Sequence, residues 1–132
     1  MIDQKRIVCN RIRTPDGTIL QSHHRHDYVN YTDKNGLEYM VDGGTSYLRR
    51  TVHDDAPYEE MSLTAEDSFE LIRKAVCWGT RGKNGDRRLE WVPISKLEVD
   101  HIYSILETQT HAAKWLLELM EQELEYRIEC GD

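Results

Sequence analysis

Residues 27–41, DYVNYTDKNGLEYMV, decide the fold class of this chain. The first part, residues 27–32, is rich in the aromatic and β-branched residues that strands favour. The Asn35-Gly36 dipeptide follows, and Asn-Gly accepts the positive φ angles of a tight hairpin turn. Residues 37–41 are expected to pair back across that turn, so the stretch predicts an antiparallel hairpin.

Further strands are predicted on both sides of this hairpin. Before it, two short β-rich segments are separated by a Pro-Asp-Gly turn, and after it an Asp-Gly-Gly turn leads into another short strand. The expected strands cover residues 6–13, 18–22, 27–32, 37–41 and 47–50. Residues 6–53 are therefore expected to form an antiparallel meander.

The remainder of the chain is predicted to be mostly helical. Residues 56–62 are expected to form a loop, and a helix over 64–78 is predicted from helical spacing of apolar residues and from a capping box formed by Thr64 and Asp67. Residues 79–93 are predicted as a glycine-rich loop and a strand, and 97–129 as helical. The expected fold is α+β, a single domain over 1–132 in which the N-terminal antiparallel β-meander packs against the C-terminal helices.

Composition limits the possible functions. The chain has 132 residues and is 39% hydrophobic, and it contains neither a long apolar segment nor a signal-like N-terminus. We therefore expect a soluble intracellular protein without a membrane partner. The three cysteines, Cys9, Cys77 and Cys130, are far apart and predict neither a disulfide framework nor a zinc site.

Charge is unevenly distributed along the chain. The net charge is −7, and residues 98–132 carry nine acidic residues against Lys114 and Arg127. Residues 71–91 instead carry six basic residues against two acidic ones. The acidic balance disfavours binding to duplex nucleic acid, which needs a broad basic surface. A local site for a small anion remains compatible with the basic segment.

The basic segment contains a glycine-rich stretch, Trp78 to Asp86. Its Gly82-Lys83 pair does not match the Walker phosphate loop, because Cys77 and Asn84 stand where that pattern needs a glycine and a Ser or Thr. Backbone N–H groups beside Arg81, Lys83, Arg87 and Arg88 are candidates to hold a phosphate. Trp78 and Trp91 are candidates to stack on a base. The alternative is a solvated hairpin with Trp78 in the core.

Two further arginine pairs are weaker candidates. Arg49-Arg50 follows Tyr47, and arginine forks suit diphosphates, although neighbours on a strand point to opposite faces. Tyr126-Arg127 lies in an acidic helix, where Arg127 has the alternative role of an ion pair with Glu123.

No catalytic set of residues is apparent. His24, His26 and Asp27 resemble a metal-ligand group, but a polar strand edge or an anion contact is the preferred interpretation. His101 and His111 are interpreted as surface residues. We therefore expect a protein that is not an enzyme and that binds no metal and no cofactor.

Several sequence blocks together resemble one phage family, the first Thoeris anti-defence family, also called anti-TIR sponge proteins. The blocks span residues 8–20, 24–29, 40–44, 47–50, 78–85, 100–102 and 123–127. The resemblance implies a homo-oligomer in the host cytoplasm that sequesters cyclic ADP-ribose isomers without cleaving them. Some members also hold cyclic oligonucleotides at a second site.

The ligand-binding residues are predicted on these blocks by their chemistry. They are Arg49, Arg50, Trp78, Thr80, Arg81, Gly82, Asn84, Tyr126 and Arg127. Two alternatives remain open at this point. One is a metal-dependent phosphoesterase that uses His24, His26 and Asp27 to degrade such a signal, and the other is a protein–protein interaction module that uses the acidic C-terminal helix.

Overall fold

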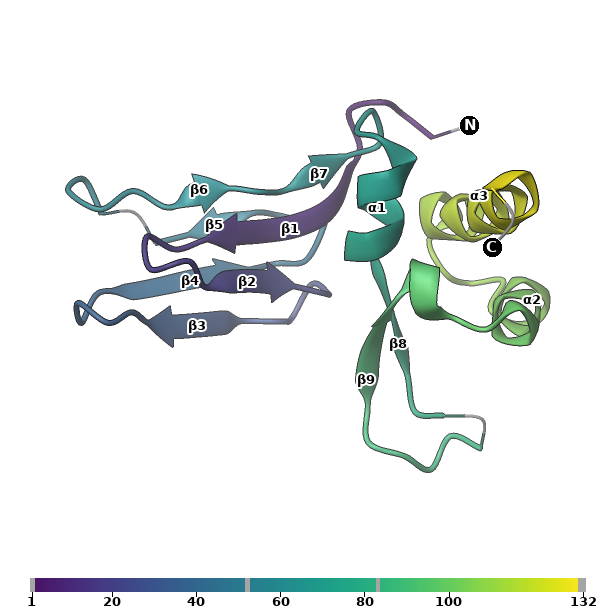
Figure 1. Ribbon diagram of the computed structural model, residues 1–132. Coiled ribbons are helices and arrows are strands. Elements are labelled where there is room, and N and C mark those ends of the chain that lie inside the picture. The colour runs from purple at the N-terminus through teal and green to yellow at the C-terminus, as the bar shows by residue number, and fades with distance from the viewer. Residues whose placement is uncertain (1, 52, 83, 131–132) are drawn as a thin grey trace. The chain divides into compact units, whose positions relative to one another are not determined.

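The computed structural model describes residues 2–51, 53–82 and 84–130. Antiparallel strands occupy the N-terminal half and helices the C-terminal half, which confirms the predicted α+β class (Figure 1). Contacts within the chain divide it into two compact units. We call Gln4–Asp67 the strand unit, and the part that begins at Ser68 the helical unit.

The strand unit contains two antiparallel sheets. In the first, β1 (Ile7–Arg13) pairs with β2 (Ile19–Ser22) on one side and with the two short strands β6 (Glu59–Glu60) and β7 (Leu63–Thr64) on the other. In the second, the order is β3 (Val29–Thr32), β4 (Glu38–Asp42), β5 (Arg49–Arg50). The antiparallel strands predicted over residues 6–53 are confirmed as β1 to β5, with Val52 outside the described residues. They form two sheets rather than one continuous meander, because the structure describes no pairing between β2 and β3.

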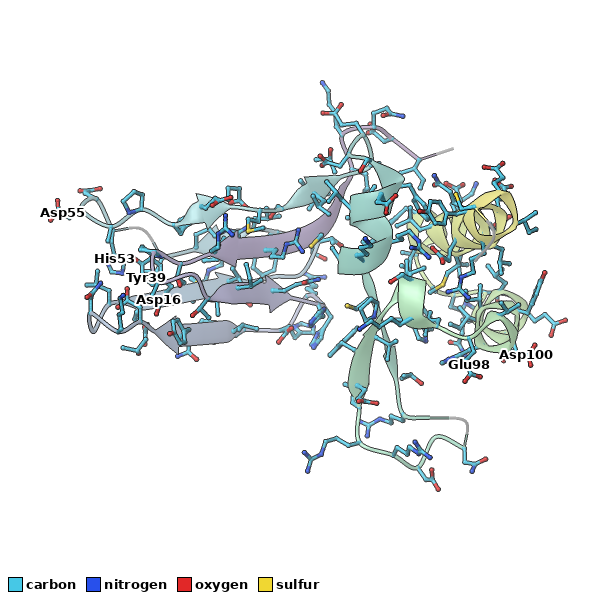
Figure 2. The ribbon with its side chains drawn as sticks, viewed as in Figure 1. Asp16, Tyr39, His53, Asp55, Glu98 and Asp100 are labelled. Atoms are coloured by element: carbon cyan, nitrogen blue, oxygen red, sulfur yellow. The ribbon has the colours of Figure 1, made fainter. Side chains whose placement is uncertain are left out.

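The central hairpin closes as its sequence predicts. The β3–β4 register places Tyr31 opposite Tyr39, and Gly36 in the turn has a φ of +81°. The buried side chains of Ile12, Leu20, Tyr39 and Val41 form the core beneath it. The Tyr39 hydroxyl donates to the carbonyl of Ala56, so even this buried aromatic residue has its polar atom satisfied. Figure 2 shows Tyr39, His53 and Asp16 at the same end of the strands.

A buried amide joins β1 to the turn after β4. Asn10 is fully buried, and its side-chain nitrogen donates to the carbonyls of Asp42 at 3.1 Å and Gly44 at 2.8 Å. Ser22 completes the connection, because its hydroxyl accepts from the Gly44 N–H at 2.9 Å and donates to the Asp27 carbonyl at 2.7 Å. The segment before β3 and the turn after β4, at one end of that hairpin, are thereby fixed to β1 and β2.

The helical unit contains α1 (Phe69–Ala75), β8 (Cys77–Thr80), β9 (Glu90–Pro93), the 3-10 turn η1 (Ile94–Lys96), α2 (Val99–Thr108) and α3 (Lys114–Cys130). Ile72, Ile94, Ile102, Leu119 and Met120 are its most buried apolar side chains. The helical part predicted over 97–129 is confirmed as two helices, since α2 ends at Thr108 and α3 begins at Lys114.

The helix predicted over 64–78 is shorter than expected. Thr64 and Asp67 bond to each other, with the Thr64 N–H donating to the Asp67 carboxylate at 2.8 Å, but they close a turn that precedes the helix. Ser68 caps α1 instead, through a bond from the Leu71 N–H. At the other end Val76 is extended and accepts from the Ile94 N–H, so the following residues join a strand.

Two other local predictions are wrong for a related reason. Residues 77–80 were expected to lie in a helix end and a loop, but they form β8 because β9 offers them a pairing partner. The predicted loop over 56–62 contains β6, whose partner β1 lies more than 45 residues away in sequence. Local propensity carries no information about partners at that separation.

The close approach at Gly44 yields a stability prediction. Gly44 has a φ of +54°, and a Cβ added there would lie 2.5 Å from the backbone carbon of His24. Gly17 has a φ of +91° but open space around it. Gly17→Ala should therefore cost only the ~1–2 kcal/mol of left-handed backbone strain. Gly44→Ala should cost more than ~3 kcal/mol because backbone must also move.

The comparison is made by urea unfolding of both variants and the parent protein. Equal losses in the two variants would show that the packing of Gly44 on the His24 segment contributes nothing beyond its φ angle.

Candidate functional site

The basic glycine-rich segment forms a hairpin. Strands β8 and β9 pair in the register Cys77 with Pro93, Trp78 with Val92, Gly79 with Trp91 and Thr80 with Glu90. The connecting loop closes through a bond from the Arg87 N–H to the Arg81 carbonyl at 2.9 Å. Figure 1 shows this ribbon extending away from α1 and the η1 turn of the same unit. Thr80, Arg81, Gly82 and Asn84, all predicted site residues, are thus brought together at one tip.

Two of the loop's backbone N–H groups are already used within the loop. The Gly82 N–H donates to the Thr80 hydroxyl at 3.1 Å, and the Gly85 N–H donates to the Gly82 carbonyl at 3.2 Å. Neither is oriented outward, so the predicted backbone cradle for a phosphate does not include them. Lys83, also predicted there, lies outside the described residues. Side-chain cations are left as the main anion-binding groups of this tip.

Three exposed arginines supply these cations. Arg81, Arg87 and Arg88 are exposed, and within the part of the chain that the structure describes none of their guanidinium groups forms an ion pair. Arg87 lies across Gly82, since a Cβ there would be 2.8 Å from its Cδ atom. That packing places the Arg87 side chain beside the strand end that carries Arg81. Asp86 is the described carboxylate of the same loop and leaves a positive excess.

The two tryptophans of the ribbon lie on opposite faces. Trp78 is paired with Val92, and Trp91 is the next residue along β9, so the alternation of a strand directs the two indoles to different sides. Trp91 covers Gly79, where a Cβ would lie 2.9 Å from the ring. A base that stacks on Trp78 therefore cannot also stack on Trp91, so the two indoles do not form one stacking surface.

Tyr126 and Arg127 lie on α3 in a buried ionic cluster. Glu123 is fully buried and accepts two bonds from Arg73, each 2.8 Å, and one from Arg127 at 2.6 Å. Arg127 also donates to the carbonyls of Ile94 and Ser95. The Tyr126 ring covers Arg73, whose guanidinium carbon is 4.2 Å from the ring centroid. These contacts give both predicted site residues a role in holding α1, η1 and α3 together.

Charge pairing controls the ionisation of this cluster. Burial alone would raise the pKa of Glu123, but the hydrogen bonds from Arg73 and Arg127 outweigh it and hold the pKa below its usual value of 4.5. On the same helix, the Tyr126 hydroxyl donates to Glu70 at 3.0 Å, and this bond raises the pKa of the phenol. Glu123 is therefore an anion under neutral conditions and pairs with both Arg73 and Arg127.

Arg49 and Arg50 belong to the strand unit and differ sharply from each other. The Arg50 side chain is 7% exposed, donates to both carboxylate oxygens of Glu60 at 3.2 and 3.0 Å, and also contacts Ser62. Arg49 is 62% exposed and has one longer contact, 3.4 Å, with Asp42. Arg50 is thus engaged in structure, while Arg49 is open to solvent.

The histidine-rich segment, residues 23–27, forms a turn that packs on Gly44. The His26 N–H donates to Nδ1 of His24, and the His23 N–H donates to the Asp27 carboxylate at 2.8 Å. Half-burial of the His23 ring lowers its pKa. Among residues 2–51, 53–82 and 84–130, no three His, Cys, Asp or Glu side chains are arranged to hold a metal ion.

Sequence reasoning missed the buried cluster of Asn10, Ser22 and Gly44. Asn10 lies in a strand of alternating residues, where an amide looks like an ordinary polar position. The Asp42-Gly43-Gly44 turn contains the signal that could have found this cluster, because two consecutive glycines indicate close backbone approach.

Comparison with known proteins adds no relative: none of the protein-family models, curated proteins or solved structures that were compared matches the chain. In the described part of the structure, no helix has both the length and the apolar character needed to cross a membrane.

The ionic cluster gives a pH-dependent prediction. Glu123→Gln removes the buried anion that accepts from both Arg73 and Arg127 and so breaks a buried charge pairing, and unfolding at neutral pH should therefore become easier by ~3–5 kcal/mol. Because the native pKa of Glu123 is lowered, its stabilisation is complete above its ordinary value of 4.5 and is lost as the pH falls through the native pKa. The difference between parent and variant should therefore shrink in acid.

Glu121→Gln is the matched control, since Glu121 is exposed on the same helix. Urea unfolding across the pH range should show almost no effect of this change. A Glu123→Gln deficit that persists undiminished in strong acid would contradict the assigned ion pair.

Proposed function

We propose that the chain binds a cyclic nucleotide immune signal, a cyclic ADP-ribose isomer, and sequesters it without cleavage. The observation that carries the proposal is the tip of the β8–β9 hairpin, where three exposed arginines form no ion pair with described residues. Arg50, Arg73 and Arg127 each hold a carboxylate. The hairpin arginines are thus available to an external anion.

The chemistry of the tip suits a diphosphate joined to a base. Arginine donates planar, paired N–H groups that match phosphate oxygens. Trp78 lies on the same hairpin and offers a ring face for an adenine. Binding by charge and stacking requires no general base or nucleophile, which agrees with sequestration rather than turnover.

The sequence resemblance extends this proposal to a biological role. A phage anti-defence sponge of the Thoeris type would act in the host cytoplasm, as a homo-oligomer, and would need neither duplex nucleic acid nor a membrane. Cyclic oligonucleotides are a further ligand class to be tested. Of the predicted site residues, Thr80, Arg81, Gly82 and Asn84 support the role through their shared location at the tip. Trp78 lies further along the same hairpin, and Arg49 is a candidate in the strand unit.

Reversing one charge of the tip tests the site. Arg81→Glu should lower the affinity for the bound cyclic ADP-ribose isomer by at least about a hundredfold, because it replaces an attractive charge by a repulsive one. Isothermal titration calorimetry with a panel of isomers provides the measurement. Lys96→Glu makes the same change of charge at an exposed position of η1 and should leave affinity nearly unaltered.

The fate of the nucleotide distinguishes the alternatives. After titration, the complex is heat-denatured and the released nucleotide is chromatographed, and intact recovery is expected. A cleaved product that disappears with a chelator would instead favour the phosphoesterase. Absence of binding by the parent protein would overturn the proposal and favour a protein partner at the acidic C-terminal helix.

The opposite placement of the two tryptophans gives a second test. Ligand should change the fluorescence of one indole through stacking, so Trp78→Phe should abolish the signal change and Trp91→Phe should keep it. Circular dichroism checks that both variants fold. The reverse assignment, or a change that both variants retain, would remove Trp78 from the ligand site.

A further inference from the structure

The chain contains the same tripeptide twice, each time in a hairpin turn. Lys34-Asn35-Gly36 connects β3 and β4, and Lys83-Asn84-Gly85 lies in the loop between β8 and β9. We propose that Asn84 is a site of spontaneous deamidation and that Asn35, despite identical neighbours in the tripeptide, is protected by its turn. The modification would place a carboxylate among the arginines of the hairpin tip.

The reaction needs only the protein and water. The backbone nitrogen of Gly85 loses its proton and attacks the side-chain carbonyl carbon of Asn84, and the side-chain nitrogen leaves as ammonia. A five-membered succinimide remains. Water then adds to either carbonyl and opens the ring, which yields aspartate or isoaspartate and one new negative charge. A following glycine favours attack because it has no side chain to hinder it, and Asn84 and Gly85 are both exposed.

The turn at Asn35 opposes this attack. The Asp33 carboxylate accepts from the N–H groups of Asn35 and Leu37, both at 2.9 Å, and the Gly36 N–H donates to the Asp33 carbonyl at 3.0 Å. The Asp33 N–H closes the hairpin on the Leu37 carbonyl at 2.8 Å. The Gly36 N–H is thus engaged with Asp33, and three further bonds close the turn around it, so the turn must open before the nitrogen can attack. The adjacent carboxylates of Asp33 and Asp16 also disfavour loss of the Gly36 proton.

Among the described residues of the Asn84 loop, no carboxylate accepts from a backbone N–H group as Asp33 does in the other turn, and this loop carries the opposite charge. The Gly85 N–H donates to the Gly82 carbonyl at 3.2 Å, and the Arg87 N–H donates to the Arg81 carbonyl at 2.9 Å. Arg81, Arg87 and Arg88 outnumber Asp86, so the local potential favours a deprotonated Gly85 nitrogen and the anionic intermediate. Among the described residues, fewer bonds from side-chain carboxylates to the backbone must open before the attacking geometry is reached.

Site-resolved deamidation rates test the proposal. The full chain is incubated at mildly alkaline pH, digested, and analysed by mass spectrometry of the two Asn-Gly peptides, with isoaspartate detection. In the native protein Asn84 should react at least about tenfold faster than Asn35, a difference of ~1.4 kcal/mol at the barrier. In guanidinium the two rates should converge, because the tripeptides are identical. A native Asn35 rate equal to or above that of Asn84 overturns the proposal.

The effect on ligand binding rests on the proposed function and is measured separately. Asn84→Asp, the product of deamidation, should weaken binding of a cyclic ADP-ribose isomer by about tenfold or more, since it sets like charges together. Asn35→Asp is the matched control and should not weaken it. A fast native reaction at Asn84 in a protein that binds no nucleotide would uphold the modification site and remove the proposed function.

Discussion

The helical unit depends on one buried carboxylate. Glu123 lies fully inside the unit, and the arginines that pair with it come from α1 and α3, while Arg127 also reaches the carbonyls of η1. Removing a carboxylate from water is costly, and two guanidinium groups compensate only with accurate geometry. The bonds of 2.6 to 2.8 Å meet that demand. Because Val76 follows α1 directly and accepts from Ile94, the same cluster also fixes the base of the β8–β9 ribbon.

In the strand unit, neutral buried groups rather than charged ones join the elements. Asn10 donates to two carbonyls of the turn after β4, and the Ser22 hydroxyl bridges that turn to the segment before β3. The Asn10 side-chain oxygen is buried and has no hydrogen-bond partner in the described structure. A polar group left in this way is expensive, so its retention indicates how strongly the turn geometry requires the two donated bonds.

These two clusters explain which features of the molecule could be predicted from sequence. The hairpin of β3 and β4 was predictable because its turn dipeptide and its strand residues act locally. The end of α1 was not, because the extended conformation of Val76 is imposed by β9. Likewise, the sequence alone does not distinguish Arg50 and Arg127 from Arg49 and Arg81. They differ because Arg50 pairs with Glu60, while Arg127 pairs with Glu123, which also pairs with Arg73. Only the fold brings these side chains into contact.

An arginine's availability, rather than its presence in a motif, therefore distinguishes candidate ligand contacts here. A guanidinium that already satisfies a buried carboxylate cannot turn to a ligand without leaving that carboxylate uncompensated, and the cost exceeds what one phosphate contact returns. The hairpin arginines form no ion pair with a described carboxylate. The base of their ribbon is joined to the Glu123 cluster, because Ile94 bonds to Val76 and Arg127 donates to the carbonyls of Ile94 and Ser95. Ionic structure in the interior and unpaired charge at the tip are thus complementary: the first holds the hairpin in place, and the second leaves its cations free to bind.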